Sequence, residues 1–135
     1  MRKAHALAKK RINQQLSSEA QCTATLNAIA DALFVIGGKW KLRIIVALKD
    51  GNKRFNELQR LVEGISAKVL STELKELELN GFVRRRVDTG TPVVVEYELT
   101  AYSDTLEGVL QALSHWGATH KEKIRKSIQS KEPVT

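Results

Sequence analysis

Four polar side chains between residues 68 and 75 are spaced so that they share one face of a helix. They are Lys68, Ser71, Thr72 and Lys75. Leu70, Leu74 and Leu77 fall on the opposite face at about 100° per residue, which predicts that they are buried. Ammonium and hydroxyl groups donate hydrogen bonds to phosphate oxygens and to the edges of bases. The outward face therefore has the chemistry of nucleic-acid contact.

The same helix also carries three acidic residues, Glu73, Glu76 and Glu78, which make it acidic overall. None of them lies at the centre of the stripe from Lys68 to Lys75. Recognition helices touch bases mainly with their N-terminal residues, and two of the acids lie in the C-terminal half. For an isolated helix of this kind, the alternative is an ordinary solvated polar face, so the neighbouring elements must decide.

A predicted β-hairpin follows this helix. Residues 82–87 are predicted to form one strand, and residues 93–99 a second one in which Val93, Val95, Tyr97 and Leu99 alternate with Val94, Glu96 and Glu98. The five residues between them, Asp88 to Pro92, have turn chemistry. At the tip, Thr89 and Thr91 are small enough to approach a phosphate backbone closely.

The first strand of the hairpin carries three consecutive arginines, Arg84, Arg85 and Arg86. Side chains alternate between the faces of a strand, so Arg85 points away from the other two. Such a hairpin can lie along phosphates or reach into a minor groove. The alternative is a charged edge that protects the sheet from aggregation.

Two further helices are predicted ahead of these elements, from apolar residues at helical spacing. Their stripes are Leu26, Ile29, Leu33 and Ile36, then Trp40, Ile44, Ile45 and Leu48. Gly37-Gly38 ends the first helix and Asp50-Gly51 ends the second.

The connection to the candidate helix is short. Residues 53–55 are predicted to be extended, and a short helix then closes at Gly64. Ser66 is the expected N-cap of the candidate helix, which runs to Asn80, and Gly81 suits the left-handed position beyond its end. Four flanking cations can add phosphate contacts. They are Lys39, Lys41, Lys53 and Arg54.

A last long helix follows the hairpin, with Thr100 as its expected cap. Its apolar stripe is Leu106, Val109, Leu110, Leu113 and Trp116. The complete order predicts a mainly α fold with a small β-hairpin, a winged helix-turn-helix with additional N- and C-terminal dimerisation helices. We expect a basic N-terminal arm or helix over 1–24, the winged domain over 25–117 and a charged, partly helical tail over 118–135.

Composition supports these expectations. The chain has 135 residues, with 22 Lys+Arg against 15 Asp+Glu, a net charge of +7 and a pI near 9.7. This balance favours a polyanionic partner, although simple solubility would explain it equally well. No apolar run approaches the length of a membrane span, and no secretory h-region is present, so we expect a cytoplasmic protein without membrane partners.

Side chains that hold metals or perform catalysis are sparse. The one cysteine and three scattered histidines have no ligand spacing, and no phosphate loop, nucleophile elbow or carboxylate pair is present. We therefore expect no metal, no cofactor and no enzymatic activity.

A series of short motifs occurs in a fixed order along the chain. They are Gly37-Gly38-Lys39-Trp40-Lys41, Lys53-Arg54-Phe55-Asn56-Glu57-Leu58, Gly64-Ile65-Ser66, Val69-Leu70-Ser71, Leu74-Lys75-Glu76-Leu77-Glu78, Gly81-Phe82-Val83 and Val95-Glu96-Tyr97-Glu98-Leu99-Thr100. In this order they resemble the HxlR-type bacterial transcriptional regulators, winged-helix relatives of the MarR group. The resemblance covers about residues 26–117.

The resemblance implies a homodimer, whose interface is formed by the N-terminal helix and the last helix. It implies two recognition helices in successive major grooves of a pseudo-palindromic operator. DNA contact then falls on the helix that starts at Ser66 and on the wing from Arg85 to Thr91. For the interface, we assign the stripe of the last helix, Leu106, Val109, Leu110, Leu113 and Trp116.

Some members of the family sense oxidants or electrophiles through an N-terminal cysteine. The matching position in this sequence is about Asn27, followed by Ala28, whereas Cys22 lies farther upstream. Cys22 is a candidate redox sensor, and the alternative is a small apolar residue without chemistry. A redox or small-molecule effector is a candidate partner that the sequence does not identify.

The sequence thus predicts a dimeric, sequence-specific transcriptional regulator that binds double-stranded DNA. Helix 66–80 enters the major groove, and wing 82–99 lies on the backbone or in the minor groove. The predicted contact residues are Ser66, Lys68, Ser71, Thr72, Lys75, Arg85, Thr89, Thr91, Lys39 and Arg54. The alternative is a winged-helix module for protein–protein contact that lacks specific DNA binding.

Overall fold

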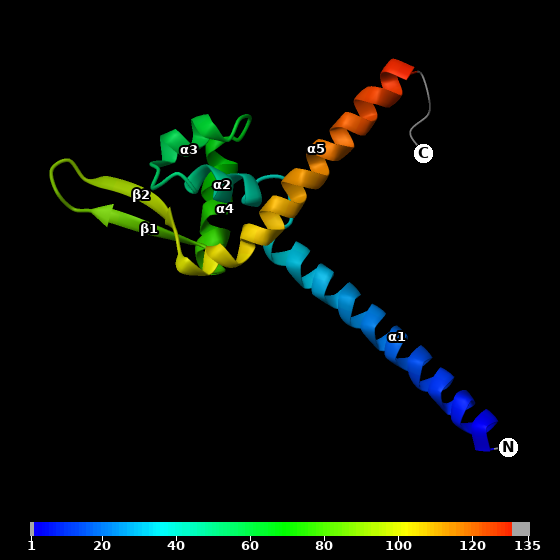
Figure 1. The fold of residues 1–135 in the computed structure, drawn as a ribbon. Helices are drawn as coiled ribbons and strands as arrows, with labels where there is room; N and C mark the ends of the chain where they lie inside the picture. The colour runs from blue at the N-terminus through cyan, green and yellow to red at the C-terminus, as the bar shows by residue number, and fades with distance from the viewer. Residues whose placement is uncertain (1, 131–135) are drawn as a thin grey trace. The chain divides into compact units, whose positions relative to one another are not determined.

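The computed structural model of the chain describes the backbone of residues 2–130 and the side chains of residues 17–130. The chain divides into two compact units after Gly38. The first unit is one helix, α1 (Arg2–Ile36) (Figure 1). The helix passes through the predicted boundary at residue 24 without a break, so the basic arm is helical.

The predicted apolar stripe of α1 is exposed at Leu26, Ile29 and Leu33, whereas Ile36 at its end is buried. Leu26, Ile29, Leu33 and Phe34 each have more than half of their surface accessible to solvent. A helix that shows such a stripe gains stability when the stripe packs against another surface. This exposure agrees with the expectation that α1 has a role in association, which stays a prediction.

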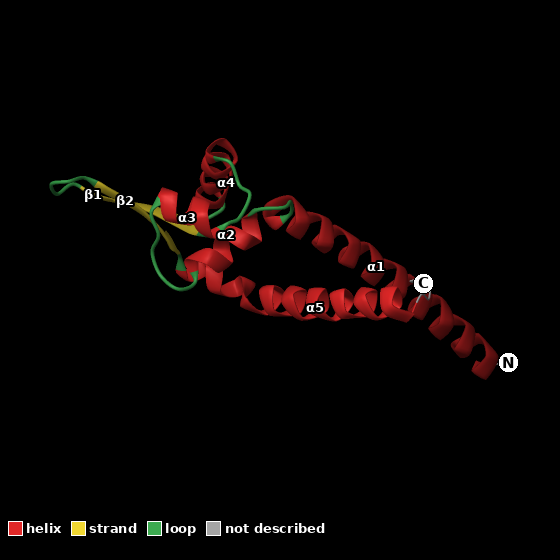
Figure 2. Cartoon of the chain, turned by 90° about the horizontal axis from the view of Figure 1, so that it is seen from above, coloured by secondary structure: helices red, strands yellow, loops and turns green. Residues whose placement is uncertain are grey.

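The second unit contains the remaining elements in the order that the sequence predicts. They are α2 (Lys41–Leu48), α3 (Phe55–Leu61), α4 (Ala67–Leu79), β1 (Val83–Asp88), β2 (Val94–Leu99), the 3-10 helix η1 (Ala101–Leu106) and α5 (Glu107–Ser130). Two views show the hairpin β1–β2 projecting from the short helices α2 to α4 (Figures 1 and 2). The predicted winged helix-turn-helix is confirmed.

The core of this unit is built from the short helices and the base of the hairpin. Its apolar members are Ile44, Ile45, Leu48, Leu58, Val62, Ile65, Leu70, Leu74, Leu77, Phe82, Val83 and Leu106. Leu70, Leu74 and Leu77 are almost completely buried, as the spacing predicts. Their burial fixes which face of α4 turns outward.

Both ends of α4 are capped by the residues that the sequence indicates. The Val69 N–H donates to Ser66 Oγ at 3.2 Å, which satisfies a free donor of the first turn. Gly81 has φ +82°, a conformation that residues with a Cβ rarely adopt. The N–H groups of Gly81 and Phe82 donate to the carbonyls of Glu78 and Leu77, both at 3.0 Å, which is the Schellman arrangement.

The wing is an antiparallel pair with a short third edge. The register pairs Val83 with Leu99 and Asp88 with Val94. On the outer edge of β2, backbone N–H groups of Lys53 and Tyr97 donate to each other's carbonyls at 3.0 and 2.7 Å. The predicted extended piece is therefore real at Lys53, but Phe55 already begins α3.

The predicted cap of the last helix is wrong. Thr100 Oγ1 donates to the Gly81 carbonyl at 2.5 Å, so this hydroxyl joins the two ends of the wing. The 3-10 helix η1 follows, and α5 begins only at Glu107. Lys49 Nζ lies 2.8 Å from Glu107 Oε2 and ties α2 to this start. The helical part of the predicted tail is confirmed up to Ser130, whereas residues 131–135 lie outside the described chain.

Candidate nucleic-acid interface

The outward face of α4 presents the predicted polar side chains. Lys68, Thr72 and Lys75 are exposed, and Ser71 is half-buried. Their common face results from the burial of Leu70, Leu74 and Leu77 on the other side. Two ammonium groups and a hydroxyl are thus available along about two turns of one helix.

Two of the candidate hydroxyl groups also have structural roles. Ser66 Oγ accepts the N-cap bond from Val69 and keeps its own O–H to donate. Thr72 Oγ1 donates to the Lys68 carbonyl at 3.1 Å and keeps acceptor capacity. Ser66 is therefore suited to a phosphate oxygen, and Thr72 to an amino group on a base edge.

Two of the three acids of α4, Glu73 and Glu76, lie on the side of the helix that faces α2. Lys41 Nζ lies 2.7 Å from Glu73 Oε2 and 2.5 Å from Glu76 Oε2. The Lys41 side chain is only 11% exposed. The expectation that Lys41 contacts phosphate is wrong, because its ammonium group is buried between two carboxylates.

Lys41 stays charged in this position. Burial acts to lower its pKa, but the hydrogen bonds and charges of Glu73 and Glu76 outweigh burial and raise the pKa above the usual 10.5. One cation thus offsets part of the charge of two of the three acids that made α4 acidic. Between residues 68 and 75 the outward face carries the charges of Lys68 and Lys75, while Glu78, which has no part in this pairing, follows one turn beyond Lys75.

The three arginines of the wing divide as strand alternation predicts. Arg84 and Arg86 share Glu98, whose carboxylate oxygens lie 3.5 and 3.4 Å from their guanidinium nitrogens. Arg85 lies opposite Tyr97 in the register and is exposed. Since Arg85 is on the other face of the strand, its charge is not shared with Glu98.

The tip of the wing is small, exposed and tightly turned. The Gly90 N–H donates to Asp88 Oδ1 at 3.0 Å, which holds the turn from within. Thr89 and Thr91 are exposed beside it. The tip therefore offers hydroxyl groups without bulk, as expected for a close approach to a backbone.

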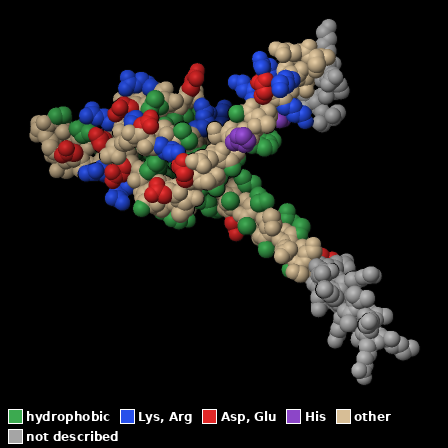
Figure 3. Space-filling model, in the orientation of Figure 1, with side chains coloured by type: hydrophobic (Ala, Val, Ile, Leu, Met, Phe, Trp, Pro, Cys, Tyr) green, Lys and Arg blue, Asp and Glu red, His purple; other side chains and the backbone are tan. Residues whose placement is uncertain are grey.

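The three other flanking cations take different positions. Arg54 is exposed ahead of α3 and lines a polar hollow together with Arg86 at the edge of the wing. Lys39 Nζ lies 4.8 Å from the centroid of the Trp40 ring, a cation–π contact. Lys53 Nζ donates to the Gly51 carbonyl at 3.3 Å. Cationic and acidic side chains alternate over this unit (Figure 3), so placement and not overall charge defines the candidate surface.

The predicted interface stripe on α5 is only partly on the surface. Leu106 is 8% exposed and belongs to the core of its own protomer, which corrects its assignment to an outward interface. Leu113 and Trp116 are 52% and 65% exposed, Val109 is also exposed, and Leu110 is half-buried. Trp116 stacks on His120 with ring centroids 4.9 Å apart, which lengthens the stripe by one turn.

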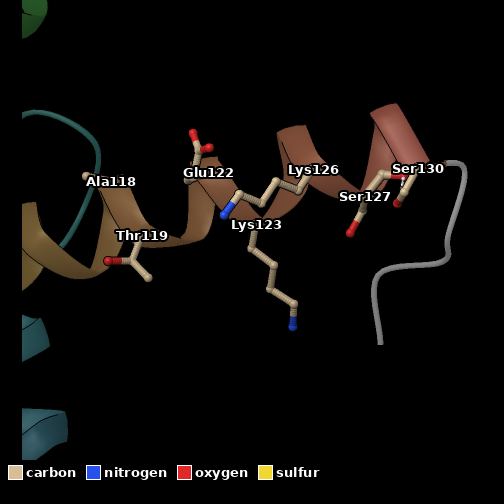
Figure 4. Close-up of a pocket in the computed structure, with 7 residues that line it drawn as sticks. All are labelled: Ala118, Thr119, Glu122, Lys123, Lys126, Ser127 and Ser130. Carbon is tan, nitrogen blue, oxygen red and sulfur yellow. Dashed lines mark hydrogen bonds between the residues drawn. The ribbon is translucent and has the colours of Figure 1, made fainter.

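A shallow hollow lies on the second half of α5 (Figure 4). It is lined by Ala118, Thr119, Glu122, Lys123, Lys126, Ser127 and Ser130. All seven belong to one helix, so the hollow has a single wall and encloses nothing. Elsewhere, Cys22 is an exposed free thiol on α1, and its role as a redox sensor stays a prediction.

Sequence reasoning missed the partners of the acids. Glu73 and Glu76 are three residues apart, which places them on one helix face and could have indicated a common cation. The identity of that cation as Lys41 depends on how α2 crosses α4, and no spacing within one helix contains this information. Arg43, which donates to the Glu63 carbonyl at 3.3 Å, was missed for the same reason.

The model of the HxlR-like helix-turn-helix family matches residues 35–125. This chain belongs to the HxlR-like helix-turn-helix family. The match spans α2 to α5 up to Arg125, so it includes the candidate helix and the wing. The chain is thus a helix-turn-helix transcriptional regulator that binds DNA.

Several relatives support this assignment. YtcD of Bacillus subtilis, described as an uncharacterized HTH-type transcriptional regulator, is 44% identical over 97 residues, which are 72% of this chain and 77% of YtcD. The HTH-type transcriptional regulator YodB of the same organism is 42% identical over 85 residues, 63% of this chain and 76% of YodB. The reduced form of the redox regulator HypR matches with a TM-score of 0.68 and 37% identity, over 73% of this chain and 98% of HypR.

No helix among the described residues is both long and apolar enough to cross a bilayer. Both long helices, α1 and α5, carry many polar side chains.

The pairing of Lys41 predicts a stability effect that a surface lysine would not show. Lys41→Met leaves Glu73 and Glu76 without their cation, and we expect the free energy of unfolding to fall by about 2–3 kcal/mol. The loss is no larger because Glu76 is partly exposed and water screens its charge. Urea unfolding followed by circular dichroism measures this change. Lys75→Met on the outward face is the matched control and should change it by less than about 0.5 kcal/mol. Equal effects of the two substitutions would contradict the pairing.

Proposed function

We propose that this protein acts as a homodimer on a pseudo-palindromic operator, with α4 in the major groove and the wing on the backbone or in the minor groove. The outward face of α4 carries this proposal. Lys68, Ser71, Thr72 and Lys75 stand there together, while Glu73 and Glu76 are paired with Lys41 on another side. A major groove admits a helix whose exposed face has such donors and acceptors.

The two parts of the surface have different tasks in this proposal. Lys75 and Thr72 lie along α4, where base edges are within reach, and Ser66 and Lys68 lie at the N-terminal end near a phosphate. Arg85, Thr89 and Thr91 contact the backbone or the minor groove from the wing. Lys39 and Arg54 add phosphate contacts that orient the domain. Affinity then comes largely from cations outside α4, and sequence discrimination comes from α4.

A homodimer is supported by the apolar surface of α5. Val109, Leu113 and Trp116 follow one side of this helix at the spacing of a helix–helix seam, and all three are exposed. Exposed apolar stripes of this kind mark association surfaces. Two copies related by a twofold axis would place two α4 helices for the two halves of an operator. The relative HypR is described as a redox regulator, so a redox effector acting through Cys22 is a candidate input for this dimer.

Lys75→Ala and Arg85→Ala should affect DNA binding in different ways. Lys75→Ala should weaken binding to a duplex that the wild-type protein selects from a random pool by about tenfold. The same substitution should weaken binding to unselected duplex much less. Fluorescence anisotropy at several salt concentrations measures both affinities.

Arg85→Ala is the matched counterpart on the wing. It should weaken binding to selected and unselected duplexes alike and reduce the slope of log affinity against log salt by about one. If the wild-type protein binds neither duplex at any of the salt concentrations, the alternative of a protein–protein module is favoured. Lys75→Ala that leaves selected binding unchanged would show that this face of α4 does not contact bases.

Association is tested by a charge on the α5 stripe. Leu113→Glu should convert the dimer into monomers at concentrations where the wild-type protein is dimeric, because a buried unpaired carboxylate costs several kcal/mol. Sedimentation equilibrium measures the mass. Gln129→Glu adds the same charge on the opposite side of α5 and should leave the dimer intact. A monomeric wild-type protein, or a dimer that tolerates Leu113→Glu, would contradict this interface.

A further inference from the structure

The turn between α3 and α4 is held weakly by its own backbone. Val62 and Ile65 are buried and anchor its two ends, while Glu63 and Gly64 between them are exposed. The Ile65 N–H donates to the Val62 carbonyl at 3.3 Å, which is at the long end of the hydrogen-bond range. Because α4 begins directly after this turn, the position of the turn sets where the N-terminal end of α4 lies.

Two side chains at the start of α2 hold this turn from outside. Arg43 Nη2 donates to the Glu63 carbonyl, also at 3.3 Å. At equal length, the bond from this charged donor is stronger than the bond between the neutral backbone groups. The Trp40 ring lies over Gly64, since a Cβ built on Gly64 would be 3.8 Å from Trp40 Cη2, an ordinary van der Waals distance. Gly64 itself has φ +87°, so a side chain is disfavoured at the point where the ring approaches.

The two contacts are linked through Arg43. Its guanidinium carbon lies 4.9 Å from the centroid of the Trp40 ring, within the range of a cation–π contact. The same guanidinium group therefore contacts both the ring and the turn backbone. A change in Arg43 therefore alters both supports at once. Lys39, the residue before Trp40, also contacts the ring, with its Nζ 4.8 Å from the ring centroid.

We propose that Arg43, with Trp40, is a positioning residue that fixes the α3–α4 turn and thereby the position in which α4 presents Thr72 and Lys75 to the bases. This inference rests on the proposed DNA-binding role of α4. Ser66 and Lys68 directly follow the turn, so a shift of the turn displaces these phosphate contacts first and moves Thr72 and Lys75, which contact the bases, along with them. Contacts to base edges tolerate displacements of only about 0.5 Å. Phosphate attraction from the wing does not depend on this turn.

Arg43→Met tests the inference, because it removes the guanidinium group and keeps an apolar stem. The matched control is Arg60→Met, which removes the same charge from an exposed site on α3. We expect Arg43→Met to lower the ratio of affinities for selected and unselected duplexes by about tenfold, and Arg60→Met to change it by less than about twofold. A loss of overall stability or of charge alone would weaken both duplexes together and leave the ratio unchanged.

Amide hydrogen exchange of the free protein separates this inference from the proposed function. In Arg43→Met, the amides of residues 63–68 should exchange about tenfold faster, while those of β1 and β2 keep the wild-type rate. An unchanged rate at residues 63–68, or equal acceleration throughout the unit, would overturn the inference. If the wild-type protein prefers no duplex sequence, the proposed function fails, and the exchange rates still decide whether Arg43 positions the turn.

Discussion

The ammonium group of Lys41 holds α2 and α4 together through two carboxylates on consecutive turns of α4. Glu73 and Glu76 cannot face outward while they accept from this cation, at 2.7 and 2.5 Å. Removing one member of a partly buried pair leaves uncompensated charge, so the pairing strongly favours one rotation of α4 about its axis. The apolar residues Leu70, Leu74 and Leu77 favour the same rotation. The outward position of Lys68 and Lys75 follows from both.

Ion pairs within the wing also determine which of its cations face outward. Glu98 forms ion pairs with Arg84 and Arg86, so the charge of two of the three arginines is partly neutralised within the hairpin. Such exposed pairs contribute little to stability, but they determine which cation stays available on the other face. The cation that stays available on the other face is Arg85. In both elements, intramolecular ion pairs select the few cations that face a partner, which a net charge of +7 alone does not reveal.

The local features of this fold could be predicted from the sequence, since they depend on neighbours along the chain. Ser66 as N-cap, Gly81 beyond the end of α4 and the alternation of Arg84, Arg85 and Arg86 belong to this group. Features that depend on contacts between distant elements could not be predicted. Thr100 was expected to cap a helix but bonds to Gly81, and Leu106 was expected at an interface but packs in the core. Lys41 was considered for a phosphate contact, because its spacing does not show that α2 crosses α4 beside Glu73.

Site-specific disulfide capture tests most directly whether the outward face of α4 meets base edges. A Thr72→Cys variant in a Cys22→Ser background would be mixed with the selected duplex carrying a thiol tether on a major-groove base edge. Ser127→Cys on α5 is the control. The account predicts efficient capture from position 72 at one or two adjacent base pairs in each half of the duplex, and none from position 127. Equal capture from both positions, or capture from neither by a protein that retains its affinity, would contradict it.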